Sequence, residues 1–147
     1  MTRRLSRRLL RHHLPLAFVS AAITWFFYAT RPYPDILTRL SFSTAWPALV
    51  LLTVTLAIGP WRVLTRKPPA LSVDLRRDIG IWAGIVGVLH AGVGQFVHLR
   101  GRPWLYYMYE NWQREHWQPL RHDMFGFANF TGLLAALILL ALLVTSN

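Results

Sequence analysis

A stretch of 21 residues without Asp, Glu, Lys or Arg, from Ile79 to Leu99, most constrains what this chain can fold into. As an α-helix it would be about 31 Å long, close to the thickness of one hydrocarbon core. Hydrophobic residues make up 54% of the chain and charged residues only 15%, a profile typical of integral membrane proteins. The stretch therefore predicts a membrane-spanning helix over residues 79–99.

Small side chains recur along this predicted helix at alternating spacings of four and three residues, which places them on one face: Gly80, Gly84, Gly87, Ala91 and Gly94. His90 lies between Gly87 and Gly94 near mid-span, where an ionisable group is costly and marks a functional site. Two interpretations stay open. The small face packs against another helix, or it leaves room for a flat macrocycle whose metal is ligated by His90.

Three further apolar windows predict helices at about 15–30, 43–64 and 124–145. The basic start and apolar run are also features of a secretory signal, but the bulky run Trp25–Tyr28 and the missing cleavage pattern favour an uncleaved helix. Pro47 is expected in the first turn of the second helix, and Gly59-Pro60 near its end. The sequence thus predicts an all-α integral membrane protein, a four-helix transmembrane bundle forming a single domain over residues 1–147.

The net charge of +10 does not indicate a nucleic-acid partner, because the basic residues lie in the short segments between apolar windows. Residues 1–13 and 62–78 together carry ten Lys and Arg, whereas residues 31–45 and 100–123 carry six, offset by four acids. By the positive-inside rule both termini are expected in the cytoplasm, with membrane lipid as the immediate partner. The expected location is a bacterial inner membrane.

The absence of cysteine removes thiolate ligands and iron–sulfur clusters, so metal ligation falls to the six histidines. His98 is expected at the external interface, His12 and His13 at the cytoplasmic boundary, and His116 and His122 in the external loop. A low-spin b-type haem takes two axial imidazoles. The chain offers one well-placed imidazole, His90, and no visible second.

Three other polar side chains are candidates for supporting roles. Arg76 precedes His90 by fourteen residues, which is about 21 Å along a helix and about 40° from its face. Arg76 is expected either to pair with haem propionates or an anionic cofactor, or simply to contact lipid phosphate. Gln95 and Asn129 are expected to hydrogen-bond between helices.

The segment 100–123 is crowded with aromatic rings that prefer the membrane–water interface: Trp104, Tyr106, Tyr107, Tyr109, Trp112 and Trp117. It is interpreted as an interfacial loop or short helix, with a docking surface for a soluble partner as the alternative. No nucleophile triad, intramembrane carboxylate pair or phosphate-binding glycine loop is present.

Three runs resemble the ferric-reductase-like transmembrane family: TLAIGPWRVL, LRRDIGIWAGIVGVLH and TGLLAALILLALLVTSN. Within that family the chain is most similar to the MsrQ (YedZ) haem-binding subunits of the periplasmic methionine-sulfoxide reductase system. The resemblance covers residues 10–99 and 126–147, and its most specific part runs from Leu75 to His90.

The resemblance implies a b-type cytochrome that moves electrons from quinol or a flavin reductase to an external molybdenum partner. His90 matches the family's haem ligand in the third helix, and Arg76 falls where this branch carries Arg. Family members normally continue into a further helix with a His pair. The expectation is therefore either a truncated or split relative, whose second ligand comes from another chain or a missing segment, or a degenerate relative that no longer binds haem as the family does.

Two hypotheses follow from the sequence. In the first, the protein is an electron-transfer subunit of an oxidoreductase, rather than a self-contained enzyme, with His90 as metal ligand and Arg76, Gly87 and Gly94 beside haem b. The partner is a periplasmic oxidoreductase or a second membrane subunit. In the second, it is a haem-free membrane scaffold or assembly protein. A weaker third hypothesis is a quinone site near His90 and Gln95.

Overall fold

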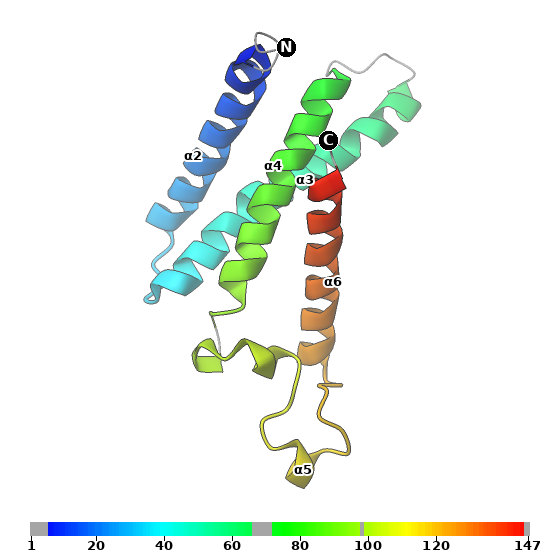
Figure 1. Ribbon diagram of the computed structural model, residues 1–147. Coiled ribbons are helices and arrows are strands. Elements are labelled where there is room, and N and C mark those ends of the chain that lie inside the picture. The colour runs from blue at the N-terminus through cyan, green and yellow to red at the C-terminus, as the bar shows by residue number, and fades with distance from the viewer. Residues whose placement is uncertain (1–5, 66–71, 98, 146–147) are drawn as a thin grey trace.

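The protein is described from a computed structural model that covers residues 6–65, 72–97 and 99–145. Within these residues the chain is helical and contains no β-strand, only an isolated antiparallel bridge between Met108 and Leu120. The long helices are α2 (Leu14–Thr30), α3 (Ile36–Thr65), α4 (Val73–Gly94) and α6 (Met124–Thr145), shown in Figure 1. The predicted all-α class is confirmed.

Short helical turns complete the fold. A π-helical turn, η1 (Leu9–His13), leads into α2, so that one continuous helix runs from Ser6 to Thr30. The connection between α4 and α6 contains two 3₁₀ turns and one short helix: η2 (Leu99–Gly101), η3 (Pro103–Tyr106) and α5 (Trp112–Glu115).

Three helices are long and apolar enough to cross a membrane: Ser6–Thr30, Ile36–Thr65 and Met124–Thr145. The predicted helix at 124–145 is confirmed residue for residue, and the first helix begins before the predicted residue 15. α4 is not among the three, because its uncharged part ends at Gly94. Residues 79–94 would be about 24 Å long, shorter than a hydrocarbon core of about 30 Å.

The predicted bounds of the helix at 79–99 are wrong at both ends. α4 begins six residues earlier, because the Ser72 hydroxyl caps it by accepting a hydrogen bond from the Leu75 N–H at 3.1 Å. It ends at Gly94, and the chain then turns through Leu99 and Gly101, both with positive φ. His98 lies outside the described residues.

The second helix also differs from the prediction. α3 begins at Ile36 rather than near residue 43, and both Pro47 and Pro60 lie inside it. Proline removes one backbone hydrogen bond but is tolerated in membrane helices where neighbouring groups compensate. Pro47 is fully buried, and so is Ser43, whose hydroxyl donates to the Arg39 carbonyl at 2.7 Å. Tertiary packing at this buried turn thus outweighs the local tendency of proline to end a helix.

The helices do not close into a compact bundle. α3 and α4 form an antiparallel pair, with α2 on one side and α6 on the other, and α6 packs against α4 without contacting α2 or α3. α6 is also displaced along α4, because Leu143, close to its end, lies against Gly84 (Figure 1). The first turns of α4 therefore extend beyond the end of α6.

The start of α6 depends on Asp123. Its carboxylate accepts the Gly126 N–H at 2.7 Å, which is a helix N-cap, and pairs with Arg121 at 2.6 Å. The Arg121 and Gly126 hydrogen bonds lower the pKa of Asp123 to about 2. Its contribution to stability is therefore present above the ordinary Asp pKa and is lost as the pH falls through about 2.

We expect Asp123→Ala to destabilise the protein by about 1 kcal/mol, the usual cost of an N-cap. Thermal unfolding in detergent between pH 7 and pH 2 measures this cost. The difference from the unsubstituted protein should become smaller as the pH approaches 2. An equal difference at every pH would contradict the assignment.

Candidate functional site

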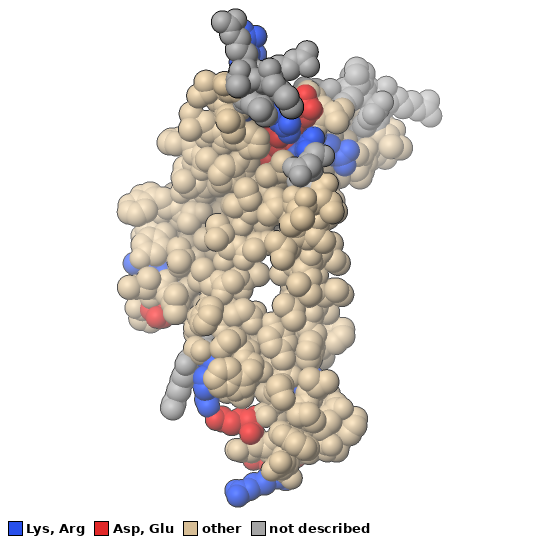
Figure 2. All heavy atoms as spheres, viewed as in Figure 1, with Lys and Arg blue, Asp and Glu red and all other residues tan. Residues whose placement is uncertain are grey.

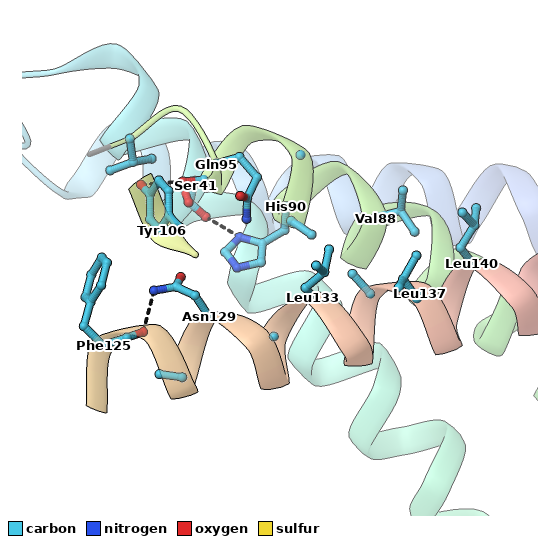
Figure 3. Close-up of a pocket in the computed structure, with 17 residues that line it drawn as sticks. Ser41, Val88, His90, Gln95, Tyr106, Phe125, Asn129, Leu133, Leu137 and Leu140 are labelled. Carbon is cyan, nitrogen blue, oxygen red and sulfur yellow. Dashed lines mark hydrogen bonds between the residues drawn. The ribbon is translucent and has the colours of Figure 1, made fainter. Parts of the chain in front are cut away.

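His90 is held by the backbone of α3. Its Nδ1 lies 2.9 Å from the Ser41 carbonyl oxygen and 3.5 Å from the Thr44 hydroxyl. A carbonyl only accepts hydrogen bonds, so Nδ1 carries the proton and donates it. The neutral ring then has its lone pair on Nε2. Figure 3 shows the ring directed from α4 toward α6, between Ser41 and Asn129.

Two cavities meet at His90. One has a volume of about 550 Å³ and lies toward the α4–α6 connection, and the other, of about 470 Å³, lies between α3, α4 and α6. Both are lined by His90, Ala91, Gly132 and Ala136. Figure 2 shows an opening through the middle of the molecule. Volumes of this size are in the range of small-molecule and cofactor sites.

The hollow exists because small residues from three helices converge on it. The second cavity takes two alanines from α3, three small residues from α4 and three from α6: Ala45, Ala48, Ala83, Gly87, Ala91, Gly132, Ala135 and Ala136. Larger side chains border it, including Phe42 and Trp46. A concentration of small residues on facing helices normally brings the backbones together. Here α3 and α6 remain apart, and the space between them is left open.

The small-residue face of α4 is shared between two neighbours. A Cβ atom at Gly80 would lie 3.4 Å from Thr55, and one at Gly94 would lie 3.7 Å from Ser41, both on α3. A Cβ atom at Gly87 would lie 3.0 Å from Leu139 on α6. Of the two interpretations of this face, helix packing therefore holds at Gly80, where α3 lies close, and at Gly87, where α6 lies close.

Gly87 and Gly94 nevertheless border the cavities. Gly87 lines the second cavity, and Gly94 lines the first. Each of these two glycines therefore allows a neighbouring helix to pack closely and also leaves volume in a cavity.

Arg76 and His90 both face α3, as their spacing predicts. Arg76 Nε donates to the Thr55 carbonyl at 3.3 Å, and His90 bonds the Ser41 carbonyl. Arg76 and His90 are fourteen residues apart on α4, and their partners Thr55 and Ser41 are fourteen residues apart on α3. Equal spacing on both helices is expected where two antiparallel helices stay in regular contact. Arg76 lines neither cavity. The structure thus places it at the opposite end of α4 from His90.

The predicted hydrogen bonds of Gln95 and Asn129 between helices are not formed. Asn129 donates to the Phe125 carbonyl of its own helix at 2.7 Å (Figure 3). Gln95 accepts from the Tyr107 hydroxyl at 2.9 Å. Both amides line the first cavity. Gln95 thereby ties α4 to the α4–α6 connection.

Tyr106 covers one end of the first cavity. It is 4% exposed, stacks on Phe125 with ring centroids 5.7 Å apart, and donates to the Gly94 carbonyl at 3.1 Å. The aromatic residues of the segment 100–123, predicted to lie at the interface, therefore differ in burial. Tyr106 is buried, whereas Trp104 and Trp117 are exposed.

The remaining described histidines lie elsewhere. His116 stacks on Tyr109 in the α4–α6 connection, and its ring centroid is 5.6 Å from that of His122. His12 and His13 lie against Asp78. Within the described residues no group of three potential ligands is arranged to hold a metal ion.

The residue that sequence reasoning missed is Asp78. Its side chain is fully buried, and its carboxylate accepts hydrogen bonds from Arg8 Nε at 3.0 and 3.1 Å and from His12 Nδ1 at 2.7 Å. His13 Nε2 lies 3.4 Å from the same carboxylate. Figure 2 shows acidic and basic side chains together at this end of the molecule. The signal was present in the sequence, since Asp78 directly precedes the uncharged stretch and basic residues precede the first apolar helix.

The π-helical turn explains how one carboxylate reaches three partners. A π-helix has hydrogen bonds between residues five apart, so Arg8, His12 and His13 fall on the same face. These three side chains fix the N-terminal helix to α4. We name this group, with Asp78, the Asp78 cluster.

Comparison of the chain with protein-family models, with curated proteins and with solved structures finds no match. The chemistry that the His90 site can perform is therefore inferred from the atoms that line its cavities. An apolar cavity with one imidazole lone pair can ligate a metal or accept a proton. No carboxylate lies among the residues that line it.

We expect Arg8→Leu to destabilise the protein by about 3 kcal/mol, because it leaves a buried carboxylate without its guanidinium. Arg11→Leu is the matched control, since Arg11 is exposed on the same helix, and should change stability by less than about 0.5 kcal/mol. Unfolding in detergent, followed by circular dichroism, measures both. Equal effects would show that the Asp78 cluster contributes nothing specific.

Proposed function

We propose that this protein is a membrane subunit that binds haem b through His90 and moves electrons across the membrane to an external oxidoreductase. The observation that supports this is the orientation of His90. Metal-ligating histidines usually donate their second ring N–H to a carbonyl or carboxylate, which fixes the tautomer. His90 does so with the Ser41 carbonyl, which leaves Nε2 directed toward the cavities.

The residues around His90 fit a flat apolar group with one axial ligand. Small residues, among them Gly87 and Gly94, leave the volume, and Trp46 and Leu139 provide apolar walls. Haem iron changes its oxidation state by one electron, which is the chemistry the group would supply. Among the described residues no second imidazole lines the cavities, so the proposal assigns the second axial position to a partner chain.

Arg76 has no part in the His90 site in this proposal. It lines neither cavity and bonds the Thr55 carbonyl instead. Its exposed position near the start of α4 suits contact with lipid phosphate or with an anionic cofactor of a partner. Electrons would enter from a quinone or flavin bound to such a partner.

The proposed topology has four crossings. The three apolar helices would be joined by α4, which is short for a hydrocarbon core and would be supported by the polar groups at both of its ends. Both termini would then lie in the cytoplasm of a bacterium, with the protein in the inner membrane and the α4–α6 connection outside. The external oxidoreductase would dock against this connection.

A second candidate is a haem-free membrane scaffold. The observation that favours it is the close packing of Leu139 on Gly87 and of Leu143 on Gly84. In this alternative the glycines of α4 serve helix contacts alone, and the cavities are covered by a partner helix. Optical spectroscopy separates the two candidates.

Protein purified in detergent with added haemin should show a Soret band that shifts on reduction with dithionite. His90→Ala should abolish the band, and imidazole in the buffer should restore part of it by entering the vacated position. His122→Ala is the control, because His122 lies in the α4–α6 connection and should leave the band unchanged. No band in the unsubstituted protein would favour the scaffold.

Filling the cavity tests the site without altering His90. A side chain at Gly132 would meet no atom within 4 Å of its Cβ, and Gly132 lines both cavities. Gly132→Leu should therefore keep the thermal stability of the protein and lose the Soret band. A band of unchanged intensity would place the haem elsewhere.

A further inference from the structure

The Asp78 cluster contains two imidazoles with different hydrogen-bonding constraints. His12 Nδ1 lies 2.7 Å from Asp78 Oδ2, and among the described residues its ring has no second hydrogen-bond partner. His13 contacts protein at both ring nitrogens. Its Nε2 lies 3.4 Å from Asp78 Oδ1, and its Nδ1 lies 3.2 Å from the indole Nε1 of Trp82.

The Trp82 contact fixes the protonation state of His13. An indole N–H is a donor only, so His13 Nδ1 must accept and therefore carries no proton. The proton of the neutral ring is then on Nε2, directed at Asp78. A second proton, on Nδ1, would turn the Trp82 contact into two opposing donors and break this hydrogen bond.

The charges around His13 act in opposite directions, because Asp78 attracts a cationic ring whereas Arg8 repels it. Arg8 and His12 lie on its own helix, and Asp78 lies on α4 with Asp74 and Arg77 close by in the same helix. Arg8 already neutralises Asp78. A cationic His13 would therefore add positive charge to a group that holds a single buried carboxylate and a permanent guanidinium.

We propose that docking of the N-terminal helix on α4 is controlled by a proton at His13. In the docked arrangement His13 Nδ1 accepts from Trp82, so a proton bound at that atom on acidification releases Trp82 and loosens the helix. Acidification from pH 8 to pH 5 leaves Asp78 ionised, because an aspartate paired with arginine holds its charge. The responsive group is therefore an imidazole and not the carboxylate.

The release can reach the cavity through α2. At the other end of α2, Phe27 stacks on Trp46 with ring centroids 4.7 Å apart and an interplanar angle of 12°. Trp46 lines the second cavity together with His90. A shift of the N-terminal helix therefore moves a ring that forms a wall of the His90 site.

The experiment measures the distance between the two helices. The chain has no cysteine, so Phe18→Cys on α2 and Leu89→Cys on α4, both exposed positions, accept spin labels without background. Pulsed electron paramagnetic resonance in lipid nanodiscs at pH 8 and pH 5 gives the distance distribution. We expect a narrow distribution at pH 8 and a longer, broader one at pH 5. No haem is needed, so this result is independent of the proposed function.

Three variants in the labelled background assign the effect. His13→Asn cannot gain charge, and Trp82→Phe has no indole donor, so both should lose the pH-dependent change in distance. His12→Asn should retain it. Circular dichroism confirms that each variant is helical, and Trp82→Phe still tests the proposal if His13→Asn fails to fold. The proposal is overturned by an unchanged distance in the parent protein, by a response that persists in a folded His13→Asn or Trp82→Phe, or by its loss in His12→Asn.

Discussion

The antiparallel contact between α3 and α4 determines where every other group in this protein lies. It places Ser41 against His90 and Thr55 against Arg76, fourteen residues apart on both helices. A carbonyl oxygen of α3 thereby selects the tautomer of His90 and turns its other nitrogen away from the pair. The reactive face of the imidazole is thus set by backbone geometry and not by a neighbouring side chain.

The two flanking helices attach to this pair in different ways. The N-terminal helix is fixed at both ends, by the Asp78 cluster and by the stacking of Phe27 on Trp46. α6 touches α4 along one short region, where Leu139 and Leu143 approach Gly87 and Gly84. α6 is also attached near its start, where Phe125 stacks on Tyr106.

The sequence predicted the all-α class and the last helix well, because long apolar windows have few alternatives. It placed the ends of the helix at 79–99 wrongly, since Ser72 capping and the pairing of Asp78 with Arg8 allow charged residues inside α4. Pro47 was expected in a first turn and lies within α3, where tertiary packing prevails over the local preference. For the site, the sequence singled out His90, Gly87 and Gly94. Helical periodicity could not show that α6 covers part of the glycine face. It also could not show that Asp78 has hydrogen-bond partners 66 and 70 residues earlier in the chain.

The displacement of α6 along α4 has a consequence for how the cavity fills. Because α6 and α3 do not meet, the second cavity has a side entrance between two apolar helices. In a bilayer, a molecule that entered by this route would first dissolve in hydrocarbon, and its effective concentration would be set by partitioning into lipid. Selection among ligands would then begin in the bilayer, before any atom of His90 is touched.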